Sequence, residues 1–164
     1  MAWQNEMSNI VRNLINDPDG STYTDAREEQ VILVAAQLLL GKADFQNEYT
    51  IDVDLLALSP DPTTVSPKDN NFINIVSLQA ALIFLKGEAK TLAAQAYRIT
   101  DGPSSIDVSA AYKALQEQAK EMQDLLDWAL TEFNMGNSQG EAILTPYTVI
   151  NQQSRFNSLF YPRG

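Results

Sequence analysis

A ten-residue stretch, residues 31–40, limits what this chain can fold into more than any other feature of its sequence. All of its residues are apolar except Gln37. A helix formed here is therefore apolar on nearly every face, which a helix lying alone on a water-exposed surface does not tolerate. Thr24 precedes the acidic residues of a helix start and is the predicted N-cap. We predict a helix over residues 25–40 that is central in its domain or packed between that domain and a neighbour.

Three further segments place apolar residues at the three- and four-residue spacings of an amphipathic helix. We predict helices over residues 4–15, 69–97 and 108–133. Residues 16–20 and 98–107 are rich in Gly, Pro, Asn and Asp and favour turns between them. The predicted fold class is mainly α, a bundle of about four helices. The clearest apolar stripe belongs to the last helix: Val108, Ala111, Tyr112, Leu115, Ala119, Met122, Leu125, Leu126, Ala129 and Phe133.

Residues 49–55 alternate apolar and polar side chains, which is typical of a half-buried strand. Three prolines within residues 59–67 exclude a helix there and favour an exposed loop. We therefore predict a small β-hairpin or extended insertion at about residues 49–67, within a helical domain of residues 1–137. The strand face expected to be buried carries Tyr49, Ile51, Val53 and Leu55.

The last segment, residues 138–164, differs from the rest of the chain in charge. The whole chain has a net charge of −10, whereas residues 142–164 contain no acidic and two basic side chains. We predict an extended C-terminal arm that docks on an acidic surface of a neighbouring protein. A disordered tail is the alternative. The predicted interface residues are the arm's aromatic and basic side chains: Tyr147, Arg155, Phe156, Phe160, Tyr161 and Arg163.

Composition excludes several classes of function. The chain has no Cys and no His, which excludes disulfides, zinc fingers, iron–sulfur centres and His- or Cys-based triads. Its acidic balance disfavours sequence-independent nucleic-acid binding. The N-terminus has no basic and apolar leader, and the apolar run at residues 31–40 is short, so we predict neither a signal peptide nor a membrane span. Gly41 and Lys42 lack the flanking residues of a phosphate-binding loop.

Two pairs of acidic residues are candidates for catalysis or metal binding. Asp52 and Asp54 lie on one face of the predicted strand, and Glu28 and Glu29 lie in the first turns of a predicted helix. We interpret the first pair as solvent-facing strand residues and the second as charges that stabilise the helix N-terminus. The sequence therefore predicts no catalytic residue, cofactor or metal site, and an enzyme that uses these carboxylates is a minor alternative.

Four stretches of the sequence resemble the small, mostly helical head–tail adaptor proteins of tailed bacteriophages, also called connector or neck proteins. They are residues 24–31 (TDAREEQV), 72–81 (FINIVSLQAA), 97–107 (YRITDGPSSID) and 142–147 (AILTPY). The resemblance implies a non-enzymatic subunit of a ring, typically a dodecamer, between the portal protein and the tail or a further neck protein. It also implies a place in the virion neck, and in the host cytoplasm during assembly.

The resemblance further implies that DNA passes through the ring without specific binding, and an acidic channel would repel the DNA backbone. Two alternatives stay open. A tail-terminator or tail-completion protein would carry more β structure. A regulatory module outside the virion would bind one partner as a monomer or dimer.

Overall fold

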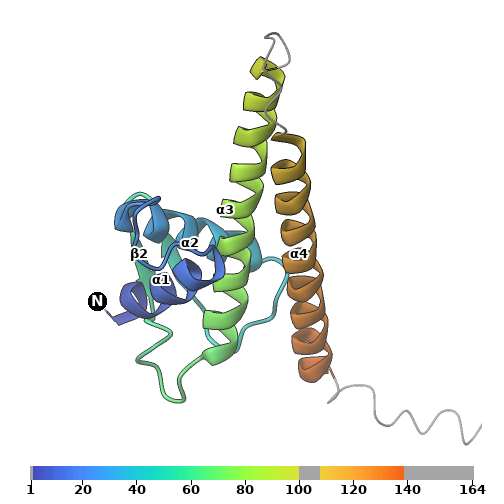
Figure 1. Ribbon diagram of the computed structural model, residues 1–164. Helices are drawn as coiled ribbons and strands as arrows, with labels where there is room; N and C mark the ends of the chain where they lie inside the picture. The colour runs from blue at the N-terminus through green and yellow to red at the C-terminus, as the bar shows by residue number, and fades with distance from the viewer. Residues whose placement is uncertain (1, 100–107, 139–164) are drawn as a thin grey trace, which may run out of the picture.

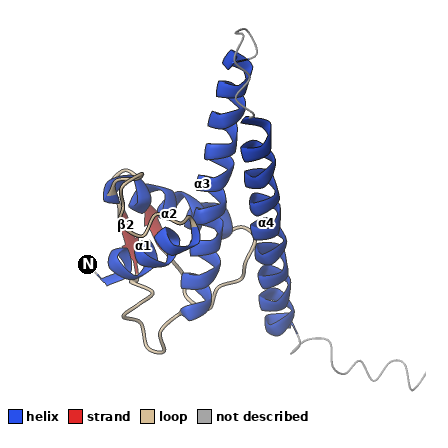
Figure 2. Ribbon diagram, in the orientation of Figure 1, coloured by secondary structure: helices blue, strands red, loops and turns tan. Residues whose placement is uncertain are grey.

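The computed structural model describes residues 2–99 and 108–138 of the 164-residue chain. In chain order the elements are α1 (Ala2–Leu14), α2 (Asp25–Leu39), β1 (Thr50–Asp52), β2 (Ala57–Ser59), α3 (Asn70–Ile99) and α4 (Val108–Ser138) (Figure 2). This confirms the mainly α fold with a small antiparallel hairpin. Apart from its first residue, which ends α4, the predicted C-terminal arm lies outside the described residues. So do all six of its predicted interface residues.

Helix α3 makes the most extensive contacts in the molecule. Figure 1 shows α1, α2 and the hairpin on one side of α3 and α4 on the other. The packing of α3 against α4 is the most extensive in the molecule, followed by its packing against α2 and α1. The C-terminal half of α3 and the N-terminal half of α4 extend beyond the body as a two-helix projection (Figure 1). The central position predicted for residues 25–40 is therefore occupied by α3.

One face of α2 is nevertheless buried as its composition requires. Its fully or nearly buried apolar residues are Val31, Ile32, Leu33, Ala35, Ala36 and Leu39. The opposite face exposes Val34 and Leu38. Thr24 stands at the N-cap position, but it caps the helix through its backbone carbonyl, which accepts hydrogen bonds from the N–H groups of Arg27 and Glu28. Helix α2 therefore carries more apolar surface than the rest of the described molecule covers.

An aromatic cluster joins α3 to the loop before the hairpin. The ring of Phe72 is fully buried and stacks on Tyr49, with their centroids 3.9 Å apart. Phe45 contacts Phe72 on one side and Phe133 of α4 on the other. Asp69 caps α3 by accepting a 3.0 Å hydrogen bond from the backbone N–H of Phe72, and it also accepts one from the Tyr49 hydroxyl. Burial of a phenylalanine side chain contributes about 1.5–3 kcal/mol.

The hairpin corrects the predicted strand. Only Thr50–Asp52 forms the first strand, and it pairs with Ala57–Ser59, which ends at the first residue of the expected loop. Asp52 Oδ1 accepts hydrogen bonds from the backbone N–H groups of Asp54 and Leu55 at 3.0 and 2.9 Å, and this turns the chain. The alternation therefore stops at the turn, and Leu55 is 78% exposed instead of buried.

Within α3, the segment Asn70–Ala94 is long and apolar enough to cross a membrane by length and composition. It is longer than the stretch at residues 31–40 on which we based the expectation of no membrane span. The core helix of a soluble protein passes the same test, and 61% of the most apolar part of this segment is buried inside the molecule. Its apolar character thus fits its place between α1, α2 and α4.

Candidate protein-interaction surfaces

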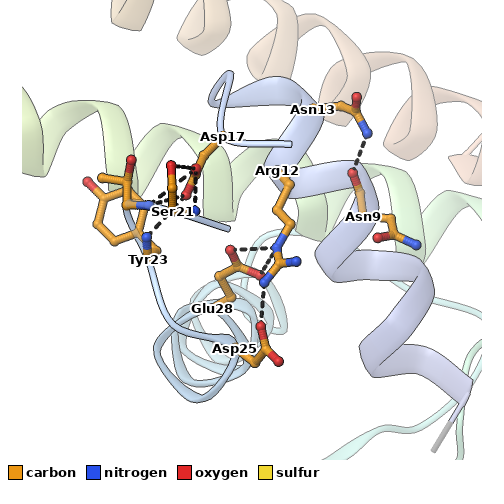
Figure 3. Close-up of polar contacts among 9 residues, drawn as sticks. Asn9, Arg12, Asn13, Asp17, Ser21, Tyr23, Asp25 and Glu28 are labelled. Carbon is orange, nitrogen blue, oxygen red and sulfur yellow. Dashed lines mark hydrogen bonds and ion pairs between the residues drawn. The ribbon is translucent and has the colours of Figure 1, made fainter. Parts of the chain in front are cut away.

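A cluster of charged side chains joins α1 to the start of α2 (Figure 3). Arg12 Nε lies 2.9 Å from both carboxylate oxygens of Glu28, and Arg12 Nη2 pairs with Asp25. Because the Glu28 side chain is 0% exposed, burial raises its pKa above the ordinary value, while the Arg12 guanidinium acts in the opposite direction. Glu28 lies in the first turn of α2, as we interpreted it, but it is also half of a buried ion pair with Arg12.

The turn before α2 is built around the carboxylate of Asp17 (Figure 3). It accepts hydrogen bonds from the backbone N–H groups of Ser21, Thr22 and Tyr23 at 2.9, 3.0 and 3.1 Å. Burial alone would raise the pKa of Asp17, but these hydrogen bonds outweigh it and lower the pKa. Gly20 has φ +61°, and a Cβ there would lie 2.8 Å from Arg12 Nη2.

These carboxylates are thus engaged in holding two helices and a turn together. Asp52, the other acidic candidate, holds the hairpin turn, and Asp54 is exposed beside it. Over residues 2–99 and 108–138, no group of three or more acidic side chains is placed to hold a metal ion.

An apolar face runs along α4 on the side away from its buried residues. Leu125, Trp128 and Met135 are spaced by three and seven residues, so they lie on one side of the helix. Trp128 is 62% exposed, and Leu125 is 47% exposed although the predicted stripe made it a core residue. The adjacent Leu126 is 2% exposed and packs in the core instead. Sequence analysis missed Trp128, whose signal was its position three residues after Leu125.

A second apolar face lies on α2. Leu38 is 52% exposed, and Val34 lies one turn before it on the same side of the helix. Figure 1 shows α2 and α4 on different sides of α3, so the α2 face and the α4 face are carried by two separate helices. Exposed aromatic and aliphatic side chains of this size are the usual anchors of protein–protein contacts.

A basic groove of about 660 Å³ lies between α3 and α4. Lys86 and Lys90 of α3 and Lys113 and Lys120 of α4 line it, and Glu117 is its single acidic lining residue. The floor includes small apolar side chains, and Lys86 Nζ donates a 2.8 Å hydrogen bond to Gln123 Oε1. Four of the eleven basic residues of an acidic chain therefore gather on one groove.

Comparisons with protein-family models, curated proteins and solved structures found no match to this chain. The resemblance to head–tail adaptors therefore depends on the four stretches of sequence. Residues 24–31 and 72–81 fall at the starts of α2 and α3. Residues 142–147 and most of residues 97–107 lie outside the described part of the chain.

Proposed function

We propose that this chain is a structural subunit that assembles with copies of itself into a ring. The observation that carries the proposal is the pair of apolar faces on α2 and α4, represented by Leu38 and Trp128. A two-fold dimer uses one patch twice, whereas a ring subunit uses two different patches, one for each neighbour. Two apolar faces on different helices fit a subunit that contacts one neighbour through each face.

We further propose that this ring is a head-to-tail adaptor in the neck of a tailed bacteriophage. The resemblance over residues 24–31 and 72–81 supports it, as does the mainly helical fold. The tail-terminator alternative has less support, because among residues 2–99 and 108–138 the β structure amounts to two three-residue strands. Its partners are then further copies of itself, the portal protein, and the tail or a further neck protein.

In this role DNA passes through the ring without specific binding, and the net charge of −10 favours that passage. The chain then resides in the virion neck, and in the host cytoplasm during assembly. The predicted arm, residues 138–164, would reach an adjoining subunit or the portal protein.

Quantitative mass spectrometry of virions purified from the phage that encodes the chain tests the proposal. We expect a constant copy number, relative to the major capsid protein, that matches one dodecameric ring. Trp128→Ala should remove the chain from particles while leaving its helical content unchanged. Asp127→Ala, an exposed change on the same helix but outside the apolar face, is the matched control and should be incorporated normally. Absence of the unaltered chain from particles would favour the regulatory module, with the Trp128 face as its single contact.

A further inference from the structure

The basic groove between α3 and α4 has the composition of a binding site for an acidic segment. Lysines line both of its walls, two on each helix, and all four side chains are exposed. Among the described residues, Lys90, Lys113 and Lys120 have no carboxylate within ion-pair distance. The floor is apolar and narrow, with Ala89, Ala93 and Ala119 where larger side chains would fill the space. An apolar side chain next to a carboxylate would complement both the apolar floor and the lysines of the walls.

The turn of the β-hairpin carries that combination. Leu55 is 78% exposed at the tip, and the exposed Asp54 directly precedes it. Leu56 follows with φ +50°, a conformation that glycine or asparagine adopts at less cost than leucine. A turn under no constraint except its own stability would favour those residues. Leu56 packs against the hydrophobic core, whereas Leu55 beside it remains exposed.

We propose that the groove of one copy receives the hairpin tip of a second copy, with Leu55 on the alanine floor and Asp54 between the lysines. This inference rests on the proposed ring assembly and adds a further contact between neighbouring copies to the contacts of the α2 and α4 faces. The hairpin and α4 lie on opposite sides of α3 (Figure 1), so the tip serves a groove in another molecule. A contact between two different patches repeats from copy to copy and closes a ring when the rotation permits.

The positive charge of the groove favours the hairpin tip over the chain's own C-terminal arm as its occupant. Residues 142–164 contain two basic and no acidic side chains, so lysine-lined walls repel them. Residues 1–61, which include the hairpin, contain eleven acidic and three basic side chains. Much of that excess is already used inside the molecule, since Arg12 pairs with Asp25 and Glu28, whereas Asp54 has no ion pair among the described residues.

Cross-linking of the full chain tests the contact directly, because the natural sequence contains no cysteine. Equal amounts of two single variants, Leu55→Cys and Ala93→Cys, are mixed under oxidising conditions, one of them carrying a mass tag. A disulfide requires Cα atoms within about 7 Å. We therefore expect the mixed dimer in excess over both homodimers. Replacing Ala93→Cys with Glu132→Cys, exposed on α4 outside the groove, is the control and should give no excess.

Charge reversal then tests the stated chemistry. Lys90→Glu with Lys113→Glu in the groove partner should abolish the excess of mixed dimer, and Asp54→Lys in the tip partner should restore part of it. Asp52 stays unchanged because it holds the hairpin turn. Circular dichroism confirms that each variant keeps its helices. A mixed dimer no more abundant than the control, or one insensitive to these reversals, would overturn the proposal.

This result is separable from the proposed function. If sedimentation shows rings but no tip-to-groove cross-link forms, the ring stands and this contact is wrong. If the cross-link forms but the chain is absent from virions, the contact stands and the head–tail role is wrong.

Discussion

The α1–α2 junction packs on α3 in a different way from helix α4. In the junction, Trp3, Met7 and Val11 are buried on α1, and a buried ion pair connects the two helices. Along the part of α4 whose side chains are described, only Ala119 and Leu126 are buried. The junction is therefore stabilised by contacts within the molecule. By contrast, α4 packs on α3 along one stripe and exposes Leu125, Trp128 and Met135.

The largest test of this contrast is Arg12→Ala in the junction. The change leaves the Glu28 carboxylate buried without its partner, and we expect a loss of about 3 kcal/mol in the free energy of unfolding at neutral pH. Since burial raises the pKa of Glu28, protonation removes the buried charge, so the loss should shrink as the pH falls. Urea unfolding at several pH values measures both effects.

Two companion variants show whether the charge is the cause. Arg27→Ala removes an exposed arginine that contacts Gln30, and its effect should stay within about 0.5 kcal/mol. Arg12→Met combined with Glu28→Leu removes both charges and should recover most of the lost stability. If the double variant is as unstable as Arg12→Ala, the ion pair is not what the junction requires.

A smaller effect is expected on α4, where two adjacent leucines differ in burial. Leu126→Ala empties a core position and should cost about 2–3 kcal/mol. Leu125→Ala, its neighbour at 47% exposure, should change the free energy of unfolding by no more than about 0.5 kcal/mol. Thermal unfolding of the dilute chain measures both. Equal losses at the two positions would show that α4 is a core helix on both sides.

The sequence predicted the helices well because their periodicity is a local property. The starts at residues 25 and 108 and the long helix of residues 69–97 agree with α2, α4 and α3 to within about two residues. The differences from the prediction arose where one polar side chain decided the outcome. The Asp52 carboxylate ended the strand alternation, and Arg12, sixteen residues away, made Glu28 a core residue.

The candidate surfaces were less accessible to sequence reasoning. The apolar surplus of residues 31–40 correctly indicated more apolar surface than one domain covers, and Leu38 is part of it. The basic groove was not predicted, since its lysines come from two helices and meet only when α3 and α4 pack. We assigned Leu125 to the core stripe, but it is exposed. A periodic pattern indicates the direction of an apolar stripe without deciding which residues form its edge. A one-residue difference separates Leu125 from Leu126.

The finest test of the junction is its dependence on acid. Hydrogen bonds from the turn hold the pKa of Asp17 below its ordinary value, so the carboxylate stabilises the fold above about pH 4 and loses this contribution as the pH falls through its lowered pKa. Asp17→Asn cannot accept the same set of charge-assisted hydrogen bonds, and its free energy of unfolding should be lower than that of the natural chain at pH 7. The difference in the free energy of unfolding between the two chains should narrow in acid, because protonation removes the same interaction from the natural chain.

Asp19→Asn, an exposed change in the same turn, is the control and should follow the natural chain throughout. A constant difference between the natural chain and Asp17→Asn from pH 7 to pH 2 would mean that the charge of Asp17 is not what stabilises the turn.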